Sequence, residues 1–398
     1  MISILFVILL GCIAGTITGI IPGIHINLVA TIILAGSPFL ATFVSPLLIA
    51  IFIISMAITH TFTDFLPSCF LGAPDSDTVL SVLPGHKYLL SGKGYEAVFL
   101  TVVGSIFGLL LTILFTPIII PFLRFIYPIL QNYIGYILIV VVLLMVLREK
   151  TKIWPLITFL LSGALGIIVF NIATLKDPLL PMLSGLFGVS VLFLSYKDNV
   201  KIPQQKITRP EIDKRTGIKA ISSSVAVGSI ASFFPGISPA HAAIIATQIV
   251  RRLSTAGFLI LVGSLNTVNM VVSMITLYTI DKARNGAIVI MSEILETFNL
   301  DTLILLIGVS LVAGLLATII TLKLSKIFSS LITRVNYQKL CIAVMVIIML
   351  VVAALTGFMG IFVLVVSTLI GIIPALKGIG RNHLMGCLLL PVILYYIL

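Results

Sequence analysis

The stretch GTITGIIPGI, residues 15–24, lies in an apolar run that contains no Lys, Arg, Asp or Glu from Met1 to Thr63. A second stretch, GSIASFFPGI at residues 228–237, matches it at five positions with a constant offset of 213 residues. Both begin with Gly and carry a Pro-Gly pair near their end, and both residue types weaken or break a helix. We interpret the match as an internal duplication that divides the chain into two related halves.

The composition indicates an integral membrane protein. Hydrophobic residues make up 60% and charged residues 9% of the 398 residues, whereas soluble domains are about half apolar and about a quarter charged. The net charge of +11 does not indicate nucleic acid as a partner, because the basic residues fall between hydrophobic spans, as the positive-inside rule predicts. The sequence therefore predicts an all-α polytopic protein of the cell membrane, with lipid around it.

Apolar runs long enough to cross a membrane set the number of spans. About 20 apolar residues are needed for one span. The clear candidates are 97–120, 131–148, 154–173, 179–196, 302–322, 340–356, 358–376 and 383–398. Regions 1–72 and 219–297 are also apolar, but Gly, Pro, Ser, Thr and Asn interrupt them. We expect about ten to thirteen membrane-embedded helical segments in total.

A basic segment, residues 197–218, separates the two halves. Seven Lys or Arg residues lie between Ser195 and Lys219, which predicts that this loop is cytoplasmic. The first membrane half is then 1–196 and the second is 219–398. Counting spans onward from the loop leaves the C-terminus outside the cell.

The Pro-Gly elements predict broken helices. Pro22 and Pro235 each remove a backbone donor, and lipid tolerates such a break only where it is buried in protein or lines a cavity. Paired broken helices in transporters direct their positive N-terminal ends at an anion near the midplane. The alternative is an ordinary proline kink, with the neighbouring polar groups bonded to helix carbonyls. The residues expected to line a substrate site are Gly23, His25, Asn27, Gly236, Ser238 and His241.

A second polar segment, residues 64–95, predicts a re-entrant hairpin. Pro74 and Pro84 prevent one straight span across it. Carboxylates at membrane depth are costly and mark functional positions, so we expect a coupling site for a cation or a proton. The alternative for the hairpin carboxylates is capping of its second arm. The residues predicted for coupling are His60, Asp64, Asp75 and Asp77.

The second half has a polar pair at a corresponding place. Asn266 and Asn269 are spaced i, i+3 and so share one face of a helix. We expect both to contribute to substrate binding. No His, Cys, Asp or Glu spacing in the sequence is typical of a metal site, and we expect no cofactor beyond a coupling H⁺ or Na⁺.

The motifs resemble a known family. Each half opens with Gly-x₆-Pro-Gly, and the first half continues as Gly-x-Pro…Thr-x-Leu…Pro…Gly-x-Gly-x-x-Ala at Gly72, Pro74, Thr78, Leu80, Pro84, Gly92, Gly94 and Ala97. This resembles the large permease subunit of the tripartite tricarboxylate transporters, and more closely its stand-alone archaeal-type relatives. The resemblance implies a secondary transporter for organic anions such as citrate. It also implies a small membrane subunit and an extracytoplasmic binding protein as candidate partners.

The segment FPGISPAHAA, residues 234–243, is similar to the Ile-Pro-Gly-Val-Ser motif of a polyprenyl-phosphate transporter family. That resemblance implies a lipid-linked phosphate as the alternative cargo. An intramembrane enzyme would need a nucleophile with a base or a metal-binding signature, and the sequence has neither. The sequence therefore predicts a secondary-active permease for a small di- or tricarboxylate-like anion and no catalytic residues. A polyprenyl-phosphate translocase is the alternative, and an intramembrane enzyme, in which His25, His60 and His241 would meet in space, is a minor alternative.

Overall fold

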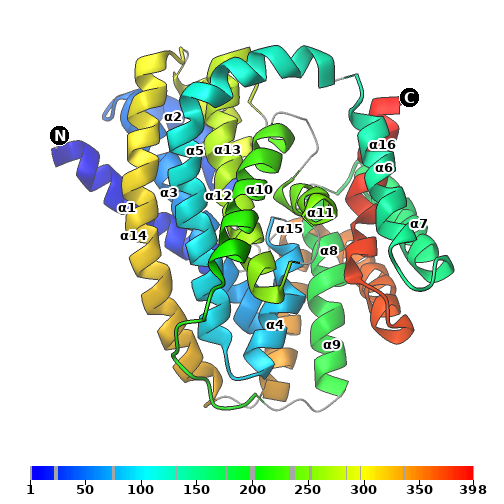
Figure 1. Cartoon of the computed structure of the whole chain (residues 1–398). Helices are drawn as coiled ribbons and strands as arrows, with labels where there is room; N and C mark the ends of the chain where they lie inside the picture. The colour runs from blue at the N-terminus through cyan, green and yellow to red at the C-terminus, as the bar shows by residue number, and fades with distance from the viewer. Residues whose placement is uncertain are drawn as a thin grey trace.

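The computed structural model is built from helices (Figure 1). It describes residues 2–21, 26–73, 77–130, 132–175, 177–197, 202–232, 238–250, 253–283, 285–295, 297–334 and 337–397. No strand occurs among these residues. The predicted all-α polytopic fold is therefore confirmed.

The elements of the first half follow one another in a fixed order. They are α1 (Ile2–Ile20), α2 (Ile26–Leu40), α3 (Pro46–Thr63), the π-helical turn η1 (Pro67–Leu71), the 3₁₀ turn η2 (Val79–Ser81), α4 (Val82–Leu90), α5 (Gly94–Leu130), α6 (Ile134–Leu147), α7 (Ile153–Phe170), α8 (Leu179–Leu183), the π-helical turn η3 (Ser184–Val189) and α9 (Ser190–Lys197).

The second half begins with α10, whose N-cap Asp213 accepts a hydrogen bond from the Thr216 backbone amide. Its elements are α10 (Lys214–Ala231), α11 (Pro239–Ile249), α12 (Thr255–Ile280), α13 (Gly286–Leu295), α14 (Leu300–Ile332), α15 (Tyr337–Lys377), the 3₁₀ turn η4 (Arg381–Met385) and α16 (Gly386–Ile397).

Eight of the described helical segments are long and apolar enough to cross a membrane. They are Ile2–Ile20, Pro46–Leu71, Gly94–Leu130, Ile153–Phe170, Leu179–Lys197, Thr255–Ile280, Leu300–Ile332 and Gln338–Lys377. Three shorter apolar helical segments accompany them: Ile134–Leu147, Gly286–Leu295 and Arg381–Ile397. Together these fall within the number of membrane-embedded segments that the sequence predicts.

The helices form two groups that are visible in Figure 1. In the first group, α1 packs on α3, α5 packs along α12, and α14 contacts both α3 and α5. In the second group, α16 packs on α6 and α7, while α15 packs on the continuous segment α8–η3–α9. Helices α3 and α12 are the most enclosed elements, because neighbouring helices cover most of their length. Polar groups on these two helices are therefore shielded from lipid.

The glycines of the opening motif bring α1 close to α3. Helix α1 continues through Gly15 and Gly19 without a break. A Cβ atom on Gly15 would lie 2.3 Å from the carbonyl oxygen of Met56, and one on Gly19 would lie 2.0 Å from the hydroxyl of Thr63. Small residues at such positions let two membrane helices approach backbone to backbone. These glycines therefore serve packing, and α1 ends only after Ile20.

Close helix packing at glycines also joins the two predicted halves. Gly104 of α5 faces the Ile260 carbonyl oxygen of α12, and a Cβ atom there would lie 2.0 Å from it. Gly263 of α12 in turn faces the Thr101 carbonyl oxygen of α5, and a Cβ atom on Gly263 would lie 2.2 Å from it. The Ser105 hydroxyl donates to the Gly263 carbonyl at 2.9 Å, because the backbones lie this close.

The predicted basic loop packs on one end of the first half. Gln205 accepts a hydrogen bond from the Gly94 backbone amide at 2.9 Å and donates to the Leu89 carbonyl at 3.0 Å. Thr208 donates to the Glu96 carboxylate at 2.6 Å. The extended segment 202–213 therefore lies against the ends of α4 and α5, at the bottom of Figure 1, whereas the C-terminus lies at the top.

Helix α15 is divided at Gly357, the residue that separates two of the predicted spans, 340–356 and 358–376. Gly357 has φ 68° and ψ −162°, a backbone conformation that is essentially restricted to glycine. No atom lies within 4 Å of a Cβ built at this position. The backbone conformation alone therefore requires glycine here.

We expect Gly357→Ala to lower the free energy of unfolding by about 1–3 kcal/mol, because the substituted residue would be held in a strained conformation. Thermal unfolding of the detergent-purified protein measures this. Gly36→Ala is the matched control, since Gly36 lies in α2 with nothing within 4 Å of its Cβ position. Equal stability of the two variants would contradict the assigned break in α15.

Candidate functional site

A chain of buried polar side chains connects α1 and α3, from the predicted first half, with α12, from the predicted second half. Helix α3 carries His60 and Thr61, with Asp64 as its C-cap. Helix α12 carries Asn266 and Thr267. All five are at most 3% exposed. Their concentration at the contact of two enclosed helices marks this crossing as the candidate site.

The centre of the site is a carboxylate bonded to an amide. Asn266 Nδ2 donates to Asp64 Oδ2 at 2.8 Å and lies 3.4 Å from the Thr61 carbonyl oxygen. A carboxylate at membrane depth is costly unless donors or a cation compensate its charge. The second half therefore supplies a donor that the first half's carboxylate requires.

Two further contacts extend the site along α3. The hydroxyls of Thr61 and Thr267 lie 3.1 Å apart. His60 Nδ1 lies 3.0 Å from the Thr18 hydroxyl, which itself donates to the Gly15 carbonyl. Since that hydroxyl proton is already used, Nδ1 of His60 is the donor in this contact. The polar chain thus runs from α1 through α3 to α12.

The segment after Asp64 is also held by hydroxyl groups. The Ser68 hydroxyl donates to the Asp64 carbonyl at 2.9 Å and lies 2.7 Å from the Thr78 hydroxyl. The π-helical turn η1 runs from Pro67 to Leu71, and its C-cap Gly72 has φ 64°. Such π-helical turns occur often at functional sites. The hydrogen bond between Ser68 and Thr78 therefore holds η1 against the turn that precedes η2.

The comparison with known proteins decides the family. The profile described as "Tripartite tricarboxylate transporter TctA family" matches residues 5–386, which is nearly the whole chain. The chain belongs to the TctA family. An uncharacterised protein of Methanocaldococcus jannaschii is 31% identical over 413 aligned residues, covering all of both chains. No solved structure matches this TctA-family chain. The family resemblance inferred from the motifs is therefore confirmed.

Several of the predicted site residues of this TctA-family protein lie outside the described residues. They include both Pro-Gly pairs and the tip of the predicted hairpin: Pro22, Gly23, His25, Pro74, Asp75, Pro235 and Gly236.

Three predicted substrate residues follow the Pro-Gly pairs in the chain and lie among the described residues. Asn27 lies in the first turn of α2, and its side chain faces Gly286 at the start of α13. Ser238 is the N-cap of α11, and its backbone amide donates to His241 Nδ1 at 3.0 Å. His241 therefore carries its proton on Nε2, and the backbone of Leu388 in α16 is a hydrogen-bond neighbour of its buried imidazole.

The remaining predicted residues lie in or near the polar chain. Asn266 contacts Asp64 directly, whereas Asn269, one turn further along α12, is only half-buried. Asp77 is half-buried in the turn before η2. Pro84 lies in the first turn of α4, where the missing backbone donor interrupts no hydrogen bond.

Sequence inspection missed the hydroxyl groups that hold the predicted residues. The signal for some of them was present in the run THTFTD, residues 59–64, where polar residues cluster in an otherwise apolar helix. Within the described chain, no group of three His, Cys, Asp or Glu side chains is arranged to hold a metal ion. The missed residues are Thr18, Thr61, Ser68, Thr78 and Thr267.

Proposed function

We propose that this TctA-family protein is a secondary-active permease for a di- or tricarboxylate-like anion, driven by H⁺ or Na⁺. The observation that carries the proposal is the hydrogen bond from Asn266 to Asp64, which joins a buried carboxylate of one half to the other half. A carboxylate that is alternately paired with an amide and with a cation or proton can couple ion binding to a movement of the two halves. Asp75, Asp77 and His60 are further candidates for coupling.

The substrate would bind near the midplane between the two Pro-Gly elements. His241 supports this, because it lies in the first turn of α11, where the positive end of the helix favours an anion. Asn27 and Ser238 lie just after the two Pro-Gly positions and provide further polar groups. The other proposed contacts are Gly23, His25, Gly236, Asn266 and Asn269.

The two halves would form an inverted repeat. Helix contacts are exchanged between the halves, since α5 packs on α12 while α14 packs on α3. Figure 1 shows α5 running upward and α14 running downward. Equivalent helices that run in opposite directions support an inverted repeat, an arrangement in which transporters bind their substrate at the repeat interface.

The proposed orientation places segment 197–218 in the cytoplasm and the C-terminus outside, in the cell membrane. Lys87 and Lys93 support it, because the ends of α4 and α5 lie against that segment, so that these positive charges gather at one end. Membership of the family also makes a small membrane subunit and an extracytoplasmic binding protein candidate partners.

Counterflow in proteoliposomes tests the function. We expect labelled citrate or a related carboxylate to exchange across the membrane, and an imposed H⁺ or Na⁺ gradient to drive its accumulation. His241→Phe should reduce exchange by at least about tenfold, because it removes a hydrogen bond to a charged group. Binding of polyprenyl phosphate without carboxylate exchange would favour the translocase instead.

A further inference from the structure

Arg381 lies in a part of the molecule that the proposed substrate path does not include. It begins η4, at the corner between α15 and α16, and is half-buried. Its Nη1 donates to the Ser190 hydroxyl at 3.1 Å. That hydroxyl donates in turn to the Leu186 carbonyl at 2.7 Å. A guanidinium has five N–H donors, so this arrangement leaves most of them available to another acceptor.

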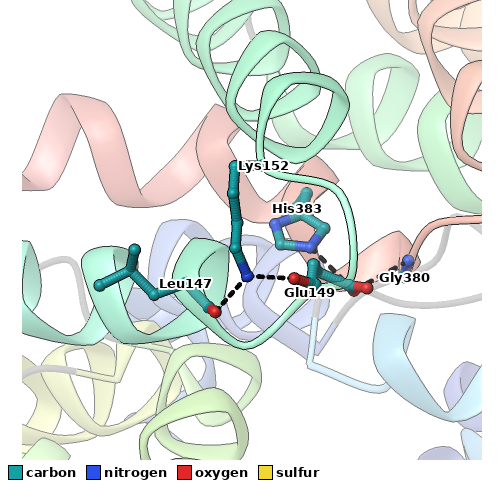
Figure 2. Close-up of polar contacts among 5 residues, drawn as sticks. All are labelled: Leu147, Glu149, Lys152, Gly380 and His383. Carbon is teal, nitrogen blue, oxygen red and sulfur yellow. Dashed lines mark hydrogen bonds and ion pairs between the residues drawn. The ribbon is translucent and has the colours of Figure 1, made fainter.

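Glu149, a carboxylate in this corner, is held by other donors. Glu149 Oε1 accepts from the Gly380 backbone amide at 3.2 Å and lies 3.1 Å from His383 Nε2 (Figure 2). Lys152 donates to the backbone carbonyls of Leu147 and Glu149. Within the described part of the chain, no carboxylate forms an ion pair with Arg381. Its charge therefore lacks a counter-ion from those residues.

The other groups around Arg381 are cationic or neutral. His86 of α4 is 3% exposed, lies 3.4 Å from the Ser195 hydroxyl, and is close enough to feel the Arg381 charge. Lys377, which ends α15, lies over the Trp154 ring at 4.0 Å. The Arg381 guanidinium, with the His86 imidazole near it, therefore forms a setting for an anion.

A half-buried guanidinium that no described carboxylate pairs with is electrostatically costly, and an oxyanion from outside the chain would relieve that cost. We propose that Arg381, held by its hydrogen bond to Ser190, forms an oxyanion-binding site where η4 meets α9. Arginine binds a carboxylate or a phosphate through two parallel hydrogen bonds. This inference rests on the proposed function in one respect, namely that the site receives an anionic group of the transported cargo.

Equilibrium binding to the full-length protein in detergent tests the site. Isothermal titration calorimetry with citrate and with inorganic phosphate should show that Arg381→Gln weakens binding by about tenfold to a hundredfold. Arg381→Lys should retain part of the affinity, because it keeps the charge without the bidentate geometry. Arg334→Gln removes an exposed arginine and is the matched control, with expected wild-type affinity.

Thermal unfolding without added anion separates a binding role from a structural one. An anion-binding Arg381 predicts that Arg381→Gln is at least as stable as the wild type, whereas a structural role predicts a lower unfolding temperature. Wild-type affinity in the Gln variant, or no binding of either anion by the wild type, would overturn the inference. Citrate exchange with wild-type affinity in Arg381→Gln would overturn this site alone. Arg381-dependent phosphate binding without any carboxylate exchange would overturn the proposed function and leave the site standing.

Discussion

Asp64→Asn is expected to reduce ion-driven accumulation of the carboxylate strongly while leaving the protein folded. Asp64 is 2% exposed and accepts a hydrogen bond from Asn266 at 2.8 Å. An amide in its place keeps the shape of the side chain but cannot carry the charge that a coupling cation or proton requires. Because hydrogen bonds to charged groups contribute about 1.5–3 kcal/mol, we expect gradient-driven uptake to fall by at least about tenfold.

The measurement compares carboxylate accumulation driven by an H⁺ or Na⁺ gradient with carboxylate exchange in the absence of an ion gradient, in the same proteoliposomes. Asp301→Asn is the control, because Asp301 is an exposed carboxylate in the first turn of α14. Asn266→Leu should also reduce uptake and should lower stability by about 1–3 kcal/mol or more, because it leaves a buried carboxylate without this donor. Wild-type accumulation by Asp64→Asn would exclude Asp64 from coupling.

Gly104→Ala is expected to be strongly destabilising although it adds a single methyl group. The new Cβ atom would lie 2.0 Å from the Ile260 carbonyl oxygen, so α5 and α12 would have to move apart. Overpacking of this kind costs about 1–3 kcal/mol, and occasionally more. The separation would also stretch the hydrogen bond from Ser105 to the Gly263 carbonyl. We therefore expect a lower unfolding temperature and less protein that remains monodisperse in detergent.

Gly308→Ala provides the matched control for that substitution. Gly308 also lies in a long helix, α14, but no atom lies within 4 Å of a Cβ built on it. Alanine there should be neutral, or stabilising by about 0.5–1 kcal/mol, because it restricts the unfolded chain and favours the helix. Similar unfolding temperatures for the two alanine variants would show that α5 and α12 do not pack as closely as described.

Local properties of the sequence predicted the membrane class, most of the spans and the family. Hydropathy depends on consecutive residues, so the apolar runs identified α14 and the segment Leu179–Lys197 directly. The predicted junction between 340–356 and 358–376 coincides with the break at Gly357. His60 and Asp64 were identified because polar residues are conspicuous in an apolar helix. The motifs that carried the family resemblance are likewise short and local.

Only the tertiary structure decided which of these residues meet. Asp64 and Asn266 are separated by 202 positions, and their contact depends on how α3 crosses α12, which no local pattern encodes. Gly15 weakens a helix in isolation, yet in the fold it allows α1 to approach α3. Glu149, His383 and Arg381 lie at the corners between helices. The packing of those corners determines the hydrogen-bond partner of each side chain. The sequence by itself determined which segments are apolar and long enough to span a membrane, because hydropathy is a local property, whereas helix packing determined the pairing of charges and donors.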